Sequence, residues 1–243
     1  MNLTGRSVLV TGGAGGLGQA IVATLTEAGA TVAVLDRVGV EPLPGVVPLA
    51  VDLCDAAAVE GVVEHCFSTL PPPCALVNNA GVIHSEPLGD MFGRTSREAR
   101  LRRWSEVRAI NLDAVFSVTM AFVDRLLQQR LRGAVVNISS VSARGIAGQS
   151  AYAATKAGVE ALALTWSKEL APLGIRACAV APGFFDTPAT HAALSEDHLR
   201  TIASEVPLRR LGLPAEVASV VRMAIENDYL NGVVIPVHGG LSV

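Results

Sequence analysis

The sequence predicts an α/β fold, a doubly wound parallel sheet of about seven strands with helices on both faces. Short runs rich in Val, Ile and Ala alternate with helix-period segments along the whole chain. These runs mostly lack an alternation of apolar and polar residues, as parallel strands covered on both faces require. Half of the 243 residues are hydrophobic and 17% are charged, which is enough apolar material for a large core.

Seven runs are predicted strands: Ser7–Thr11, Thr31–Asp36, Val46–Asp52, Ala75–Asn78, Ala134–Ser139, Ile175–Ala181 and Val233–Val237. A helix is predicted over Ala20–Ala28, Asp55 is placed to N-cap another, and Pro214 suits the first turn of a third. The prolines at 42, 44 and 48 exclude a helix from Arg37–Pro48. Because no repeat, linker or low-complexity stretch divides the chain, we expect one domain over residues 1–243.

Composition excludes several classes of function. A formal charge of −3 disfavours binding to nucleic acid or to an anionic membrane surface. The longest uncharged stretch, Cys66–Ser85, contains three consecutive prolines and therefore does not suit a membrane-spanning helix. A predicted strand begins almost at the first residue, which leaves no room for a signal peptide. The four cysteines and five histidines lack metal-ligand spacing, so we expect no metal, buried free thiols and a cytoplasmic location.

A glycine-rich turn, Thr11–Gly18, follows the first predicted strand directly and precedes the first predicted helix. Such a turn lets backbone N–H groups and the positive end of a helix meet a pyrophosphate. Asp36 ends the second predicted strand, where a carboxylate accepts hydrogen bonds from an adenosine ribose and repels a 2′-phosphate. The pattern predicts a Rossmann-type dinucleotide site that prefers NAD, although Arg37 is placed to accommodate the 2′-phosphate of NADP.

Tyr152 and Lys156 lie four residues apart in a long helical pattern, so they share one helix face. The chain contains two Tyr and two Lys in total, which makes this spacing improbable by composition alone. A cation beside a phenol favours the phenolate, and we expect it to lower the pKa of Tyr152 toward the range of acid–base catalysis. Ser139 and Ser140 stand at the carboxyl end of the fifth predicted strand, the edge at which such sheets bind ligands.

These motifs, in this order, resemble the short-chain dehydrogenase/reductase family. The resemblance is carried by TGGAGGLG, by NNAG at Asn78–Gly81, by the strand-end serine, by YAATK and by PGFFDT at Pro182–Thr187. It implies that Tyr152 is the acid–base group, that Lys156 assists it and binds the nicotinamide ribose, that Ser140 orients the substrate and that Asn111 holds a water next to Lys156. The cofactor-binding residues that it implies are Gly12, Gly16, Leu17, Gly18, Asp36, Asp52, Leu53, Asn79, Ala80, Gly81, Tyr152, Lys156, Pro182, Gly183 and Thr187.

The choice of Ser140 rests on strand register. Counting back thirteen residues from Tyr152, the usual family spacing, reaches Ser139. Aligning the strand instead selects Ser140 and shortens the following loop by one residue, which loops tolerate better than strands. Upstream, Thr95 and Glu98 are spaced as a capping box for the helix that carries Asn111.

Residues 184–210 follow the last cofactor motif and contain two short amphipathic pieces, which predicts a substrate lid. Its Phe, Ala and Leu residues favour an apolar substrate. The carboxyl-terminal half is most similar to the 3-hydroxyacyl-CoA dehydrogenase type-2 group, which implies an NAD-dependent oxidoreductase for a secondary alcohol or ketone, such as a 3-hydroxyacyl-CoA or a hydroxysteroid. The alternatives are an NADPH-dependent 3-oxoacyl-carrier-protein reductase and a catalytically silent NAD-binding regulator. Family resemblance also implies a homotetramer.

Overall fold

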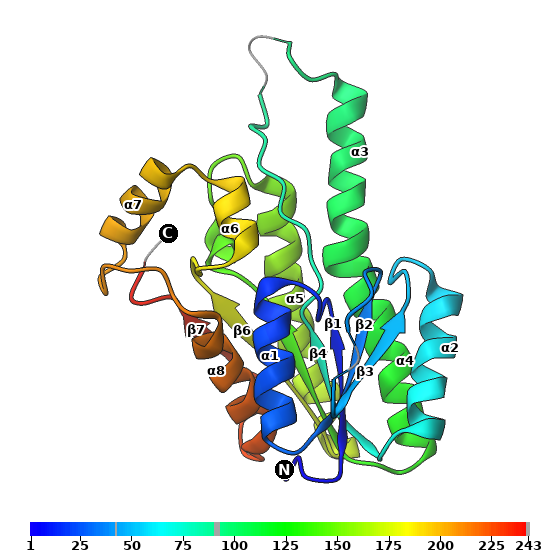
Figure 1. Cartoon of the computed structure of the whole chain (residues 1–243). Helices are drawn as coiled ribbons and strands as arrows, with labels where there is room; N and C mark the ends of the chain where they lie inside the picture. Colours follow the sequence, from blue (N-terminus) through cyan, green and yellow to red (C-terminus); the bar gives the residue numbers. More distant parts are fainter. Residues whose placement is uncertain (42, 90–92, 242–243) are drawn as a thin grey trace.

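The computed structural model describes residues 1–41, 43–89 and 93–241, and these form a parallel seven-stranded sheet (Figure 1). The strand order is β3-β2-β1-β4-β5-β6-β7. The strands are β1 (Ser7–Thr11), β2 (Thr31–Asp36), β3 (Val46–Ala50), β4 (Pro73–Asn78), β5 (Gly133–Ile138), β6 (Ile175–Pro182) and β7 (Val234–Val237). The predicted fold class is confirmed.

The helices connect successive strands. They are α1 (Gly16–Glu27), α2 (Ala56–Thr69), α3 (Arg97–Arg108), α4 (Ala114–Gln128), α5 (Ser150–Glu169), α6 (Pro188–Ala193), α7 (Glu196–Glu205) and α8 (Pro214–Glu226), with a π-helical turn η1 (Ala109–Asp113) and 3₁₀ turns η2 (Val141–Arg144) and η3 (Ala171–Leu173). As expected, the Asp55 carboxylate accepts hydrogen bonds from two N–H groups at the start of α2, and Pro214 is the first residue of α8.

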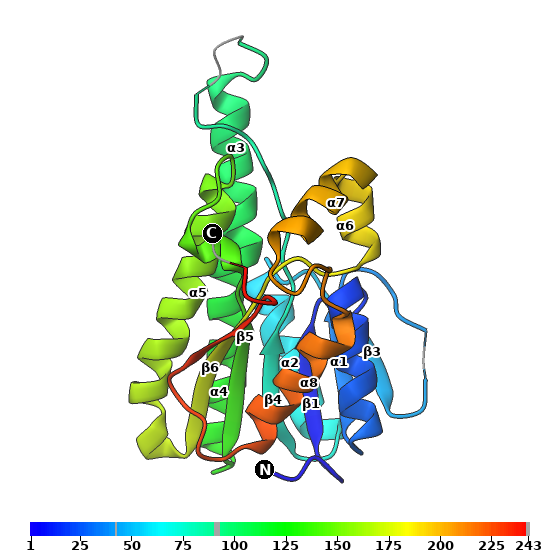
Figure 2. The same cartoon turned by 90° about the vertical axis from the view of Figure 1, so that its left-hand side faces the viewer.

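The sheet is covered on both faces, and this explains why its strands lack polarity alternation. Val8 and Val10 point to a core shared with α1 and α8. Leu9, between them, points to a second core shared with α2, α4 and α5. Figures 1 and 2 show the two helical layers on either side of the sheet. Because successive side chains point to opposite faces, a strand with two covered faces must be apolar at every position.

Some local expectations are wrong. Cys54 is exposed rather than buried, because β3 ends two residues early, at Ala50, and the chain turns outward before α2. Ser96, and not Thr95, is the N-cap of α3, since its hydroxyl accepts the Ala99 N–H. Between β2 and β3, residues 37–41 and 43–45 contain no helix, as expected; Pro42 lies outside the described residues.

The strand order places a crevice at the carboxyl edge of the sheet. From β1 the chain adds strands first on one side, β2 and β3, and later on the other, β4 to β7. The connections that leave the carboxyl ends of β1 and β4 therefore diverge, and ligands of doubly wound sheets bind at this point. In Figures 1 and 2, α6 and α7 lie at the same end of the sheet, from which α3 also projects.

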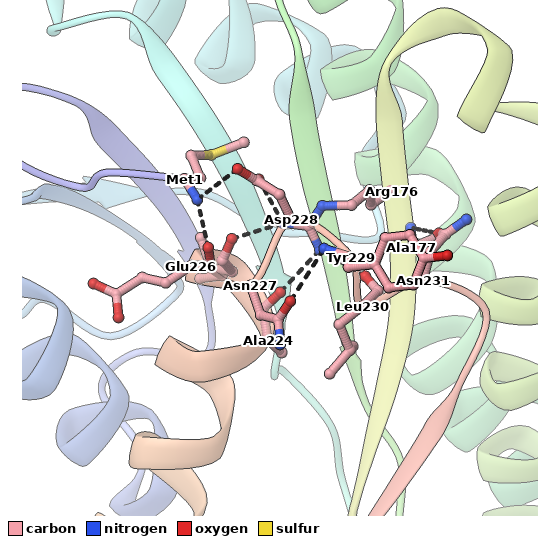
Figure 3. A network of polar contacts seen from close by, with 11 residues as sticks. Met1, Arg176, Ala177, Ala224, Glu226, Asn227, Asp228, Tyr229, Leu230 and Asn231 are labelled. Atoms are coloured by element: carbon pink, nitrogen blue, oxygen red, sulfur yellow. Dashed lines mark hydrogen bonds and ion pairs between the residues drawn. The ribbon is translucent and has the colours of Figure 1, made fainter.

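At the opposite end of the sheet, Arg176 of β6 binds the carboxyl end of α8 (Figure 3). Its guanidinium donates hydrogen bonds to the carbonyl oxygens of Ala224, Ile225 and Leu230 at 2.6 to 3.0 Å. Asp228 lies 3.8 Å from the same group, and the Arg176 side chain is 12% exposed. The last carbonyls of a helix lack partners within the helix, so Arg176 satisfies groups that would otherwise be unpaired next to the core.

We expect Arg176→Met to lower the free energy of unfolding by about 2 to 4 kcal/mol, because three carbonyls lose a charged donor. Denaturant unfolding measures this change. Arg222→Met is the matched control, since Arg222 forms a partly exposed pair with Glu226 four residues along α8, and helical pairs at this spacing contribute roughly 0.5 kcal/mol. If both variants lose the same free energy of unfolding, the stabilising role given to Arg176 is wrong.

Candidate active site

The glycine turn after β1 is held in a shape that only glycine permits at two positions. Gly12 has φ +67°, and a Cβ there would lie 2.6 Å from the Ala80 Cα. A Cβ on Gly18 would lie 2.1 Å from the Gly12 carbonyl oxygen. The start of α1 thus packs directly on the turn, and the chain after β4 packs against it from the other side.

This turn fits the pyrophosphate of a dinucleotide. Gly15 is the N-cap of α1, and within the described part of the chain no side chain caps this helix or places an acid in its first turn. The first N–H groups of α1 therefore remain available to an anion at the positive end of the helix. The predicted residues Gly16 and Leu17 both belong to this first turn.

Asp36, at the end of β2, lies beside the glycine turn. One carboxylate oxygen accepts the Ala14 N–H at 3.1 Å and the other accepts the Val38 N–H at 3.1 Å. A carboxylate has about four acceptor positions, so Asp36 can still accept from two hydroxyls. Asp52 and Leu53 follow the end of the neighbouring strand β3. The residue before them, Val51, donates its N–H to the Asp36 carbonyl oxygen, which keeps the two strand ends together.

Thr11 and Asn79 fasten β1 to β4 at the crevice. The Thr11 hydroxyl accepts the N–H groups of Asn79 and Ala80, each at 3.1 Å. In return, the Asn79 amide donates to the carbonyl oxygens of Thr11 and Gly12, at 3.1 and 2.8 Å. Asn79 and Ala80 were predicted to contact the cofactor, whereas the role of Thr11 was not. Its place as the last residue of the strand before the glycines was the available signal.

Tyr152 is the third residue of α5, and its side chain is buried near Ser140, which follows the end of β5. Burial raises the pKa of the Tyr152 phenol, and a hydrogen bond with the Ser140 hydroxyl opposes the rise. The sequence led us to expect a lowered pKa for Tyr152, and this is wrong for the protein alone. Tyr152 is only 9% exposed, so the cost of desolvating the phenolate exceeds the stabilisation from its neighbours.

Lys156 is buried one turn further along α5. Its ammonium donates to the Ile138 carbonyl oxygen, the last of β5, at 2.7 Å, and lies 5.6 Å from the centre of the Tyr152 ring. Burial lowers the pKa of Lys156 to about 8. The charge of this side chain is therefore sensitive to its surroundings in the neutral to weakly alkaline range.

Asn111 is fully buried in the π-helical turn η1, which separates α3 from α4. Its side chain accepts the Val82 N–H at 2.8 Å and donates to the Val82 carbonyl oxygen at 2.9 Å. A Cβ on Gly81 would lie 3.3 Å from the Asn111 oxygen and 3.5 Å from the Lys156 nitrogen. Single π-turns of this kind occur frequently at functional sites, and here the turn brings Asn111, Gly81 and Lys156 together.

The two adjacent serines have different surroundings. The Ser139 hydroxyl lies 2.8 Å from a Glu160 carboxylate oxygen, on the helix side of the strand end. The Ser140 hydroxyl accepts the Ser142 N–H at 3.1 Å, and of the two serines it is the one that opposes the rise in the pKa of Tyr152. This arrangement supports the strand-based choice of Ser140.

The predicted lid begins where β6 ends. Its base is closed by two backbone hydrogen bonds, from Gly212 N–H to the Phe184 carbonyl and from Asp186 N–H to the Gly212 carbonyl. Residues of this segment and of the chain around β7 line a cavity of about 220 Å³. The lining is apolar at Phe184, Phe185, Val206, Leu208 and Val237, and polar or charged at Arg210, Glu216 and His238. Thr187 lies next to the glycine turn. A Cβ added to Gly16 would lie 3.0 Å from the Cβ of Thr187. Pro182 ends β6, and the next N–H, that of Gly183, donates to Val237 of β7.

The predicted residues thus gather at one edge. The glycine turn, Asp36 and the chain after β4 form one side of the crevice, and Tyr152, Lys156, Ser140 and Asn111 form the other. Glu160 was not predicted, although its spacing of four from Lys156 places it on the same helix face. Across the described ranges, no three His, Cys, Asp or Glu side chains lie together as a metal site, and no helix there is long and apolar enough to span a membrane.

Comparison with known proteins finds relatives that match this chain over almost its whole length. The chain is 39% identical to a 3-oxoacyl-(acyl-carrier-protein) reductase of Thermotoga maritima, with all of both chains covered. It is 34% identical to a (3R)-3-hydroxyacyl-CoA dehydrogenase of Canis lupus familiaris, over 99% of this chain and 98% of the relative. An Escherichia coli 3-oxoacyl-(acyl-carrier-protein) reductase is 32% identical, with 99% of each chain covered.

The sequence model of one family, described as short chain dehydrogenase, matches residues 6–198. This range contains the glycine turn, the strand-end serine and the Tyr152–Lys156 pair. With the full-length similarity to the relatives above, it confirms the predicted family. The chain belongs to the short-chain dehydrogenase family and is an oxidoreductase.

Proposed function

We propose that this protein interconverts a secondary alcohol and a ketone with NAD(H) as cofactor. The observation that carries the proposal is the Lys156 ammonium, which the Ile138 carbonyl oxygen holds 5.6 Å from the centre of the Tyr152 ring at the same edge of the sheet as the glycine turn. A regulator that only bound the dinucleotide would need the glycine turn but not this set of proton-transferring groups. Catalysis is therefore favoured over the alternative of a silent NAD-binding protein.

Each side chain has a distinct task in the proposed reaction. A nicotinamide, when bound, supplies or accepts the hydride. Tyr152 gives a proton to the substrate oxygen during reduction and takes it during oxidation. Ser140 donates a hydrogen bond to the same oxygen or to the phenolate. Lys156, when charged, stabilises the phenolate, and Asn111 would hold a water next to Lys156.

NAD is favoured over NADP by Asp36. The carboxylate is fixed by the N–H groups of Ala14 and Val38, so it cannot swing away from an incoming phosphate group. Placing a phosphate next to this carboxylate would desolvate two negative charges side by side. Arg37 is exposed and is the group that would favour NADP instead. The NADPH-dependent reductase is therefore the alternative within the same family.

The proposed substrate is a 3-hydroxyacyl thioester or another apolar secondary alcohol, with residues 184–210 as its lid. The names of the relatives, which act on 3-oxoacyl and 3-hydroxyacyl groups, support this class, as do the apolar side chains that residues 184–210 contribute to the cavity.

We further propose a homotetramer. Phe116, Met120 and Leu127 lie on one side of α4 and are 50%, 53% and 39% exposed in the single chain. A second copy packed on α4 and α5 would cover this apolar stripe.

Replacement of Tyr152 by Phe is expected to reduce kcat by at least about 1,000-fold, because the proton donor is lost. Ser140→Ala should reduce kcat by about 100-fold, through loss of one hydrogen bond to the reacting oxygen. The assay is steady-state oxidation and reduction of 3-hydroxyacyl thioesters, hydroxysteroids and simple secondary alcohols. A protein that binds NADH tightly but turns over none of them would support the regulator instead.

The cofactor preference is tested by steady-state rates with NADH and NADPH. The parent should prefer NADH, and Asp36→Ser should shift the ratio of kcat/KM toward NADPH by about tenfold or more. Arg37→Ser is the neighbouring control and should leave the NADH rate nearly unchanged. A parent protein that prefers NADPH would overturn the assignment to NAD.

The buried ammonium predicts a specific pH dependence of stability. The pKa of Lys156 falls from 10.5 to about 8 on folding, so between these values the unfolded state binds more protons and stability rises with pH. Between pH 7.5 and 10.5, the free energy of unfolding of the parent should therefore rise by about 3 kcal/mol relative to that of Lys156→Met. Unfolding of both proteins by denaturant across this range measures the difference, in which other titrating groups cancel. If the free energy of unfolding depends on pH in the same way in the parent and in Lys156→Met, Lys156 is not desolvated in the native state.

A further inference from the structure

Glu160 is a buried acid that the proposed reaction does not use. It lies on α5, one turn after Lys156, and is 9% exposed. One of its carboxylate oxygens is 2.8 Å from the Ser139 hydroxyl. The other carboxylate oxygen is 4.0 Å from the guanidinium of Arg144, whose side chain is 70% exposed. A solvated cation at that distance offsets little of the cost of burying a carboxylate, so the hydroxyl is the short-range partner.

Ser139 connects this acid to the end of β5. Its hydroxyl also lies 3.2 Å from the Lys156 carbonyl oxygen, and its backbone N–H donates to Val180 of β6 at 2.7 Å. The preceding residue, Ile138, accepts the Lys156 ammonium. Two consecutive residues of the strand end are therefore attached to two consecutive turns of α5.

These attachments determine where Ser140 meets Tyr152. Tyr152, Lys156 and Glu160 are spaced by four residues, about 6 Å per step along one face of a rigid helix. Ser140 follows Ser139 directly. A shift of α5 along the strand end would therefore separate the Ser140 hydroxyl from the phenol and the ammonium from its carbonyl together. Displacements of about 1 Å in a reacting geometry can cost 100-fold in rate.

We propose that Ser139 and Glu160 form a positioning pair that holds α5 in register with the end of β5. Neither residue contacts the reacting atoms; both act through Ser140, Tyr152 and Lys156. The kinetic consequence rests on the function proposed above, whereas the structural consequence, the Ser140–Tyr152 contact, does not.

The first test observes Tyr152 directly. The chain has two tyrosines, and Tyr229 is fully exposed, so Tyr229→Phe leaves Tyr152 as the sole phenol. In this background, ¹³Cζ-labelled tyrosine gives one NMR signal that reports its hydrogen bonding at pH 8. Glu160→Leu and Ser139→Ala should each move this signal, because the Ser140 contact is lost. Glu160→Gln should leave it in place, since the amide oxygen still accepts the Ser139 hydrogen bond. Glu169→Leu, an exposed acid on the same helix, is the matched control.

The second test is kinetic. Glu160→Leu and Ser139→Ala should lower kcat about tenfold or more with little change in KM, and should raise the midpoint of the kcat–pH profile, because the hydrogen bond that lowers the pKa of Tyr152 is weakened. Glu160→Gln should restore kcat to within about threefold of the parent. Since the two residues act as a unit, the double variant should be no slower than the slower single variant.

Distinct results overturn the proposal. If Glu160→Leu lowers Tm but keeps the parent's NMR signal, kcat and pH midpoint, the pair only stabilises the fold. If Ser139→Ala abolishes turnover as Tyr152→Phe does while Glu160→Leu does not, Ser139 is itself the catalytic serine. If the parent turns over no alcohol or ketone, the proposed function fails, and the NMR comparison still decides whether the pair positions Tyr152.

Discussion

The carboxyl edge of this sheet depends on the burial of one ammonium group. Lys156 is 5% exposed, and its charged end donates to the last carbonyl oxygen of β5 at 2.7 Å. An ammonium removed from water needs such a partner, so helix α5 is tied to the strand end where ligands of doubly wound sheets bind. The same burial lowers the pKa of Lys156 to about 8, so the proposed positive charge beside Tyr152 depends on its neighbours. The burial of Lys156 therefore affects both the position of α5 and the acid–base behaviour of the site.

The other side of the crevice is built from backbone rather than from charge. Gly12 and Gly18 allow the turn, the start of α1 and the chain after β4 to approach within distances that any Cβ would prevent. Thr11 and Asn79 then lock the two strand ends with four hydrogen bonds between side chains and backbone. The N–H groups at the start of α1 remain uncapped by side chains in the part of the chain that the structure describes. A rigid frame around free N–H donors is what an anionic pyrophosphate requires.

Much of this arrangement was predictable because its signals are local. A strand covered on both faces must be apolar throughout, a glycine turn between strand and helix has few other uses, and a spacing of four puts Tyr152 and Lys156 on one face. The errors concern properties that arise from distant neighbours. The raised pKa of Tyr152 reflects how deeply the fold buries it, and Cys54 is exposed because β3 stops at Ala50. The π-turn around Asn111 has no periodic signal in the sequence, and the contact between Ser139 and Glu160 joins residues that are 21 positions apart.

The sequence by itself determined the α/β fold, the family, the glycine turn and the residues that could donate or accept a proton. It did so because backbone sterics, helix periodicity and side-chain chemistry act over a few neighbouring residues. Only the tertiary structure decided that Ser140 is the serine that interacts with Tyr152. It also decided that the adjacent Ser139 hydroxyl binds the Glu160 carboxylate. It also decided how far burial shifts the pKa values of Tyr152 and Lys156. Orientation and desolvation depend on everything packed around a group, and those neighbours come from distant parts of the chain.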